Sequence, residues 1–279
     1  MNRFLLILII LVSFSISGLA QIVTYKPQDE FNVDSVRAAF DNGPYFTLFK
    51  DNYFTAGTTL GHKPSQTNSD VKFQISISQR LTKSTLPFQT YLFLMYNQKC
   101  FWNVFQNSMP MHDLNFNPGF GLTKLLIVKN RLVGKATLLV EHESNGKDGT
   151  ESRSWNRITF GASIYIDPQI MIFGKTWIPI IDGQNNRDIL KYCGIYQTGI
   201  STMSVNKRIG FAVILTKRQG WNLNCNTIVE FNYRLFKKEN QFFFIQYYNG
   251  YGESLIDYNQ FHSRIRAGLV IKPQFFSDY

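Results

Sequence analysis

The chain has 279 residues, of which 44% are hydrophobic and 15% aromatic, and its formal net charge is +10. A chain of this length can form one large domain or two small ones. Its three cysteines, Cys100, Cys193 and Cys225, are too few for a disulfide framework, so either one bridge or three free thiols remain open.

The first twenty residues predict a cleaved export signal. Arg3 supplies the positive end, residues 4–14 the apolar core, and Gly18 and Ala20 the small residues of a cleavage site. A transmembrane anchor is the alternative, but the apolar run is shorter than the roughly 20 residues that a spanning helix needs. We therefore expect a signal peptide (1–20), an N-terminal periplasmic arm (21–44) and a main domain (45–279).

No later stretch is apolar enough to cross a membrane as a helix, which leaves a secreted globule, a lipid-anchored protein or a membrane β-barrel. Gln21, and not a cysteine, follows the expected cleavage point, so a bacterial lipoprotein has no support. For an exported protein, the basic charge suits anionic lipid or a negatively charged cell envelope better than nucleic acid.

From about residue 53 onward the chain alternates apolar and polar residues, as strands with two different faces do. Val71, Phe73, Ile75 and Ile77 are a clear case, because polar residues separate them. We count about twelve such segments, and an even number is typical of bacterial single-chain barrels. Their approximate centres are Phe54, Ile75, Leu94, Gly121, Leu138, Phe160, Ile172, Gly199, Val213, Phe231, Ile245 and Leu269.

Aromatic residues gather near the expected strand ends, among them Trp102, Trp155, Trp177 and Trp221, as in the interfacial girdles of membrane barrels. A soluble β-sandwich or lipocalin-like barrel would alternate equally well. The export signal, the strand number and the uncharged apolar face favour the membrane. The sequence thus predicts an all-β fold, an antiparallel twelve-stranded transmembrane β-barrel.

Three reactive side chains lie on the apolar face of one expected hairpin. From 132 to 140 and from 158 to 166 the even positions are apolar or small, and His142, Ser144 and Asn156 are also even. If the strands pair around a turn near Gly149, His142 faces Asn156 and Ser144 faces Ser154. Opposed side chains then have Cβ atoms about 5 Å apart, and same-face neighbours along a strand about 7 Å.

That row has the composition of a hydroxyl nucleophile, its general base and the group that orients the base. The register is an assumption, because a slip by one residue would send Asn156 to the other face. Glu141 and Glu143 have the opposite parity and should point away from the row.

Two long motifs stand out in the chain. The hairpin reads HESNG at 142–146 and SRSWNR at 152–157, and a second stretch at 248–259 reads YNGYGESLIDYN. Both resemble the outer-membrane phospholipase A family. Weaker similarity covers 70–105 and 188–198, so the resemblance runs from about Tyr45 to the end of the chain. Two long motifs in the right order are far more specific than a lone His-x-Ser.

The resemblance implies a twelve-stranded barrel in the bacterial outer membrane. It implies a phospholipase A1/A2, a serine-dependent carboxylic ester hydrolase that cleaves acyl esters of phospholipids and lysophospholipids at either glycerol position. It also implies calcium (Ca²⁺) as cofactor and a homodimer as the active form.

The resemblance further assigns roles to particular residues. Ser144 corresponds to the nucleophile, His142 to the general base and Asn156 to the residue that orients it. The calcium ligands would be the Ser152 hydroxyl and the Lys147 carbonyl, where the family has arginine. A carbonyl near Met109 of the partner subunit would complete the site, and Gln98 matches a glutamine of the dimer interface.

Two other functions remain open at this stage: a non-enzymatic outer-membrane barrel, either pore or structural protein, and a soluble secreted esterase.

Overall fold

The computed structural model describes residues 33–129, 131–236 and 239–272. The expected signal peptide and residues 21–32 of the expected arm lie outside these residues, so both assignments stay predictions. Among the described residues, no helix has the length and apolar character needed to cross a bilayer.

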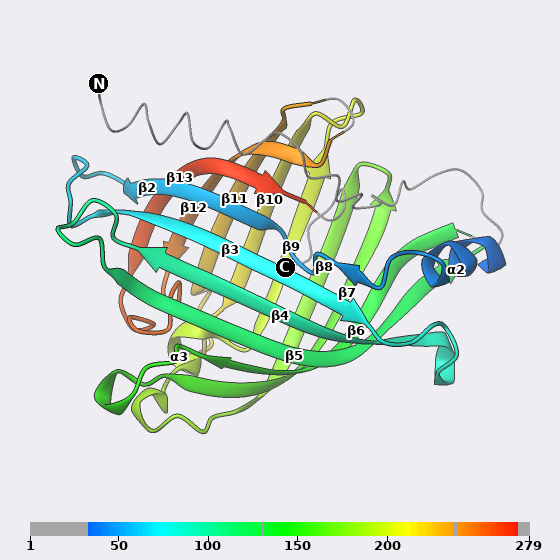
Figure 1. Cartoon of the computed structure of the whole chain (residues 1–279), viewed down its shortest axis with the longest axis horizontal. Helices are drawn as coiled ribbons and strands as arrows, with labels where there is room; N and C mark the ends of the chain where they lie inside the picture. The colour runs from blue at the N-terminus through cyan, green and yellow to red at the C-terminus, as the bar shows by residue number, and fades with distance from the viewer. Residues whose placement is uncertain (1–32, 130, 237–238, 273–279) are drawn as a thin grey trace.

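Twelve antiparallel strands form a closed barrel (Figure 1). Each pairs with its neighbours in chain order, and β2 closes the ring by pairing with both β3 and β13. The strands are β2 (Asn52–Thr59), β3 (Ser69–Arg80), β4 (Thr90–Trp102), β5 (Met111–Val128), β6 (Arg131–Ser144), β7 (Ser154–Asp167), β8 (Ile170–Ile180), β9 (Tyr196–Met203), β10 (Ile209–Lys217), β11 (Cys225–Arg234), β12 (Gln241–Gly250) and β13 (His262–Ile271).

All twelve predicted centres fall within these strands, one in each and in the same order, so the predicted fold is confirmed. Short elements complete the fold: β1 (Phe46–Thr47), which pairs with β3, the helices α2 (Val33–Asp41) and α3 (Leu190–Cys193), and the single 3₁₀ turns η1 (Pro87–Gln89), η2 (Gly149–Glu151) and η3 (Gln184–Asn186).

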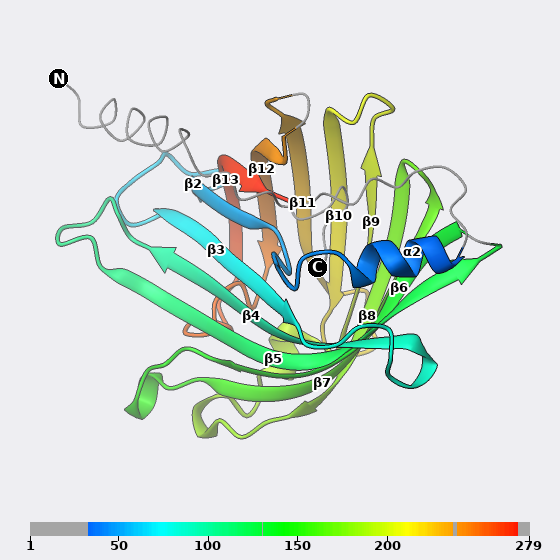
Figure 2. The same ribbon diagram turned by 45° about the vertical axis from the view of Figure 1, so that its right-hand side comes forward.

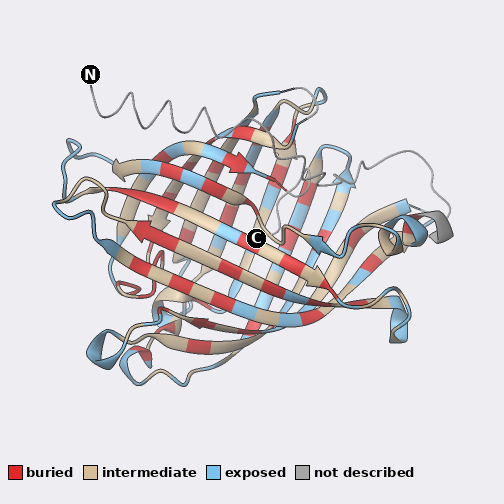
Figure 3. Cartoon of the chain, in the orientation of Figure 1, coloured by how far each residue is buried: buried red, intermediate tan, exposed pale blue. Residues whose placement is uncertain are grey.

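Burial alternates along the strands (Figure 3). Outward positions such as Ile75, Leu94 and Phe120 are apolar and about half exposed, whereas Ser76 and Asn97 face inward and are buried. A soluble barrel would bury its apolar face and expose its polar one. The reverse arrangement is typical of a barrel whose outer wall contacts lipid.

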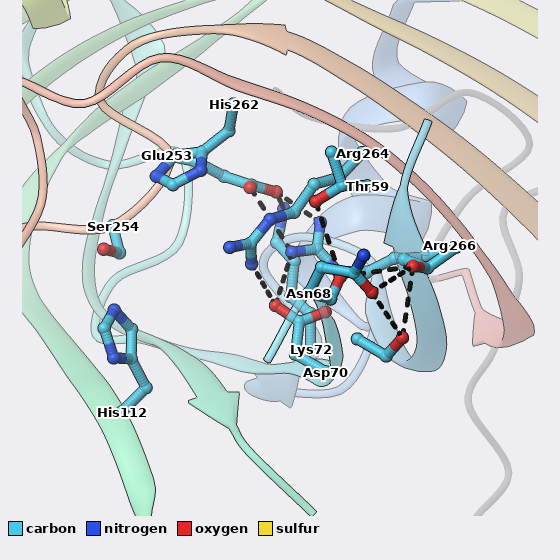
Figure 4. A network of polar contacts seen from close by, with 12 residues as sticks. Thr59, Asn68, Asp70, Lys72, His112, Glu253, Ser254, His262, Arg264 and Arg266 are labelled. Atoms are coloured by element: carbon cyan, nitrogen blue, oxygen red, sulfur yellow. Dashed lines mark hydrogen bonds and ion pairs between the residues drawn. The ribbon is translucent and has the colours of Figure 1, made fainter. Parts of the chain in front are cut away.

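The interior holds buried polar and charged side chains beside apolar clusters such as Phe93, Met95 and Leu139. It encloses a cavity of about 770 Å³. Near one end, Arg266 binds Asp70 at 2.7 Å, and Lys72 binds Glu253 at 3.1 Å; Figure 4 shows Arg264 and Arg266 both directed at Asp70. These buried charges are paired, which limits the penalty of removing them from water.

The two ends of the barrel differ. The β6–β7 connection and the long β8–β9 and β12–β13 loops lie at one end, whereas β5–β6 and β7–β8 turn tightly at the other. Helix α2 lies at the tight-turn end, away from the β6–β7 loop (Figures 1 and 2). There Val36 packs against Tyr91 and Leu125, and the Arg80 guanidinium donates to the carbonyls of Asp41 and Gly43 at 2.9 Å.

The three cysteines are free. Cys100 is buried, and Cys193 and Cys225 are half-buried. Of the two possibilities that the sequence left open, the structure therefore has three free thiols and no bridge among them.

Candidate active site

The β6–β7 hairpin has the expected register. His142 lies opposite Asn156, and Ser144 lies opposite Ser154. All are on the outward face, which they share with the exposed Val140. His142 Nδ1 and Asn156 Oδ1 are 2.8 Å apart. Because the amide oxygen can only accept, the ring proton belongs on Nδ1, and Nε2 is left as an acceptor.

Ser144 is the neighbour of His142 on the same face, two residues further along β6. Among the described residues no hydrogen bond joins its hydroxyl to the imidazole. The structure thus brings the His142 imidazole and the Asn156 amide into contact, and it leaves the Ser144 hydroxyl beside them. Such contacts often tighten only when substrate binds.

The inward face of the hairpin carries charges that support it. Arg157 bridges the two buried carboxylates, with 3.1 Å to Glu141 and 3.0 Å to Glu143. Its guanidinium stacks on the Trp155 ring at 4.2 Å, and the Trp155 indole donates to Glu143 at 3.1 Å. Glu141 and Glu143 therefore point away from the reactive row, as their parity predicted.

Strand β5 positions His142 from its other side. Pro118 lies where a ladder partner of His142 would stand, and proline has no N–H to donate. The Asn117 side chain replaces that donor: its Nδ2 donates to the His142 carbonyl at 2.8 Å and to Glu141 at 3.0 Å. No local sequence pattern indicates this support, because Asn117 lies 25 residues from His142.

The loop after Ser144 is organised around the buried Asn145. Its Oδ1 accepts from the Arg153 amide at 2.9 Å, and its Nδ2 donates to the Glu151 carbonyl at 2.9 Å. Gly146 follows with φ +64°, a conformation that favours glycine. Its N–H is the one amide of residues 145–147 with no acceptor among the described residues.

The β8–β9 loop is tied to this hairpin. The fully buried Asn186 exchanges hydrogen bonds with the Ser154 backbone, at 2.9 and 3.2 Å. Asp182 accepts from the Ser154 hydroxyl at 3.1 Å and from Asn156 Nδ2 at 2.9 Å. No sequence motif singles out Asp182, because only the folded β7–β8 pair brings it beside Asn156.

The expected metal ligands lie in two loops. Lys147 and Ser152 belong to the β6–β7 loop, where the Lys147 ammonium pairs with Glu151 at 2.9 Å and lowers the pKa of that carboxyl. Met109 lies in the β4–β5 loop, and its carbonyl accepts from the Trp102 indole at 2.8 Å. No cluster of three or more His, Cys, Asp or Glu among the described residues could hold a metal.

Oxygen atoms of the kind that Ca²⁺ prefers are nevertheless present. The Lys147 carbonyl and the Ser152 hydroxyl make no hydrogen bond within the described part of the chain, so both can serve as ligands. Two neutral oxygens are too few for one subunit to bind calcium tightly. The donor set therefore fits an ion completed by water and by a second subunit.

Gln98 lies on the outward face of β4, paired between Ile75 and Phe116 of the neighbouring strands. Its oxygen accepts from the Tyr96 hydroxyl at 2.8 Å, and its amide nitrogen donates to Cys100 Sγ at 3.4 Å. A polar amide on a lipid-facing wall is costly unless it finds partners.

Comparison with known proteins gives one consistent family. The phospholipase A1 profile matches residues 44–271. The chain is 30% identical to phospholipase A1 of Proteus vulgaris over 212 residues, which are 74% of this chain and 71% of that protein. It is 30% identical to phospholipase A1 of Escherichia coli K12 over 214 residues, again 74% and 71%.

Two solved structures have the same fold at lower identity. The outer membrane phospholipase dimer of Salmonella typhi with bound calcium gives a TM-score of 0.74 at 24% identity, covering 89% of this chain and all of that one. Outer membrane phospholipase A from Escherichia coli gives 0.71 at 24% identity, covering 82% and 94%.

Proposed function

The chain belongs to the phospholipase A1 family, and on that premise we propose that it hydrolyses acyl esters of phospholipids with Ser144 as nucleophile, His142 as general base and Asn156 as the orienting residue. The family makes it a phospholipase, and the barrel fold with its apolar outer wall makes it a protein of the outer membrane. The residues and their roles are the proposal.

One observation carries the proposal: a His–Asn hydrogen bond of 2.8 Å on the outer wall, next to a serine on the same face. Polar groups on a lipid-facing surface are costly. A row of three that matches the requirements of nucleophilic catalysis has a functional reason to lie there.

The chemistry follows from the positions of the atoms. Ser144 Oγ attacks the ester carbonyl while His142 Nε2 takes its proton, and His142 then protonates the departing lysophospholipid. Water, activated by His142, releases the fatty acid from Ser144. Asn156 holds the Nδ1 proton and so keeps Nε2 ready to accept.

The tetrahedral oxyanion needs hydrogen-bond donors. The Gly146 N–H fits this role, because it lies two residues from Ser144 and has no competing acceptor among the described residues. The acyl chains would lie along exposed apolar residues of the same wall, namely Val140, Ile178 and Ile180. An open wall gives either ester access to Ser144, which supports A1 and A2 activity and lysophospholipid substrates.

Calcium and dimerisation belong to the same proposal. The Lys147 carbonyl and the Ser152 hydroxyl would hold the ion, with a carbonyl at Met109 of the second copy. When bound, calcium supplies positive charge near the developing oxyanion. Gln98 would leave the lipid and enter the interface between two copies, where its amide can bond across.

The experiment compares phospholipid hydrolysis by the purified protein in mixed micelles with that of Ser144→Ala and of Ser163→Ala. Ser163 is a buried serine on the inward face of β7 and is the matched control. We expect Ser144→Ala to lose more than about 10³-fold in kcat, and Ser163→Ala to retain activity. EDTA should abolish hydrolysis, and excess calcium should restore it.

Hydrolysis by Ser144→Ala at the rate of the unmodified protein would refute the serine mechanism. If no variant and not even the unmodified protein hydrolysed lipid with calcium present, the non-enzymatic barrel would be the better account. The soluble secreted esterase does not fit the apolar outer wall.

A further inference from the structure

Asp182 lies directly behind the proposed triad. It follows β8, in the β8–β9 loop, and its side chain turns back onto the outward face of β7. One carboxylate oxygen accepts from Asn156 Nδ2 at 2.9 Å, and the other accepts from the Ser154 hydroxyl at 3.1 Å. Asn156 and Ser154 are same-face neighbours on β7, so two adjacent donors fix the carboxylate.

This contact settles which end of the Asn156 amide faces the imidazole. An amide has an oxygen that accepts and a nitrogen that donates, and rotation about its terminal bond exchanges them. A carboxylate can only accept, so it holds the NH₂ group on its own side. The oxygen is then directed at His142, and the observed 2.8 Å bond follows.

The same contact adds negative charge to the row. When His142 takes the Ser144 proton it becomes a cation, which a neutral amide stabilises less than a carboxylate does. Hydrogen bonds in a chain polarise one another, so a carboxylate bound to the NH₂ group makes the amide oxygen a stronger acceptor. Asp182 can therefore stabilise the His142 imidazolium through the Asn156 amide, without contacting the imidazole itself.

Other charged side chains near the hairpin have different partners. Lys147 pairs with Glu151, and Arg153 donates to the carbonyls of Thr150 and Ser152. Glu141 and Glu143 lie on the inward face and bind Arg157. Asp182 is thus the carboxylate that is hydrogen-bonded to the triad.

We propose that Asp182 is a positioning residue, which extends the row to Ser144–His142–Asn156–Asp182 by fixing the Asn156 amide and strengthening its oxygen as an acceptor. This inference rests on the proposed function.

The test measures kcat, KM and their pH profiles for Asp182→Ala and Asp182→Asn in mixed micelles with saturating calcium. We expect Asp182→Ala to lower kcat about tenfold, which corresponds to about 1.4 kcal/mol, with KM changed less than about twofold. The apparent pKa of the acidic limb of kcat/KM should fall, because the imidazolium loses stabilisation. Asp182→Asn keeps an acceptor without the charge, so its kcat should lie between the two.

A second readout does not depend on lipid turnover. The rate at which a sulfonyl fluoride labels Ser144 reports how strongly His142 activates the hydroxyl, and its pH profile should shift in the same direction. Asp167→Ala is the matched control. Asp167 is an exposed carboxylate at the far end of β7, where it accepts from the Gln169 amide at 2.6 Å, so its variant should match the unmodified enzyme.

Unchanged kcat and labelling profiles in Asp182→Ala would overturn the proposal. So would a variant that only needs more calcium and regains full kcat at saturation, because Asp182 would then serve the metal. If Asp182→Ala fails to fold, as judged by the gel shift on heating, Asp182→Asn decides by the same criteria. If Ser144→Ala loses activity while the Asp182 variants behave like the unmodified protein, only this inference is refuted. If Ser144→Ala remains active, the proposed function is refuted as well.

Discussion

Asn156 illustrates how a single residue can suit both a membrane surface and the catalytic row that we propose. A carboxylate in its place would stabilise the imidazolium better, but it would expose a full charge on an apolar wall, which is costly. The amide avoids that cost and uses both of its ends, toward His142 and toward Asp182. The negative charge is instead carried by Asp182, the next residue in the row of hydrogen bonds, which lies at an exposed loop position.

Gly146 allows a prediction at the same scale. Its φ is +64°, and a Cβ there would lie 2.8 Å from the Phe116 ring, so Gly146→Ala strains this backbone and requires the ring or the loop to move. We expect kcat to fall about tenfold, because this strain displaces the N–H that we propose as an oxyanion donor. Kinetics in mixed micelles measure this.

Gly149→Ala is the control for that variant. Gly149 has a similar φ of +58°, but a Cβ there would meet nothing within 4 Å. Gly149→Ala therefore introduces backbone strain of about 1 kcal/mol but no clash. We expect this variant to stay near full activity. Equal losses in both variants would mean that strain in the loop, and not the position of the Gly146 N–H, limits the rate.

At the scale of elements, the hairpin was predictable and its supports were not. The alternation of β6 and β7 predicted their faces, and a turn assumed near Gly149 placed His142 opposite Asn156, a register that the structure confirms. Asn117 and Asp182 reach the site from β5 and from the β8–β9 loop. Their contacts depend on strand stagger and loop path, which no local pattern encodes.

The β12–β13 loop is a second element whose role appears only in the fold. Asp257 accepts from His262 at 3.0 Å and from His112 at 3.2 Å, and Ser254 donates to its other oxygen. Burial alone would raise the pKa of Asp257, but these hydrogen bonds more than offset it and hold the pKa well below the usual range. The carboxylate thereby ties the loop to β5 and β13.

This linkage has a defined pH dependence. Because the pKa is lower in the folded state, the stabilisation is complete above the unfolded pKa near 4 and is lost only as the pH falls through the much lower folded pKa. We expect Asp257→Asn to lower the unfolding temperature at pH 7 by several degrees, about 2 kcal/mol. At pH 3 the deficit should be smaller by about 1 kcal/mol, because the unfolded carboxyl has begun to take up its proton there. Tryptophan fluorescence during heating measures both, with Asp167→Asn as control. A deficit that is as large at pH 3 as at pH 7 would contradict the assignment.

For the whole molecule, the distribution of polarity decides where the protein can exist. The outer wall is apolar, the interior holds paired charges, and the site lies at the long-loop end of that wall. The number of strands and the residues that face outward could be predicted, because apolar and polar residues alternate along each strand with a period of two. The interior pairs could not, since Asp70 and Arg266 are 196 residues apart in the chain.

Leu138 tests that polarity. It lies outward near the middle of β6 and is 37% exposed. If lipid covers it, Leu138→Arg must bring a charge toward the bilayer interior, which costs about 2–4 kcal/mol in membrane barrels. In water, an outward arginine would change stability by less than about 0.5 kcal/mol. Guanidinium unfolding of the protein inserted in phospholipid vesicles measures the difference, and Leu138→Ala, which removes apolar surface without adding charge, should lose less. Equal stability of Leu138→Arg and the unmodified protein in vesicles would mean that lipid does not cover this wall, and the ester substrate could then not reach Ser144 from the bilayer.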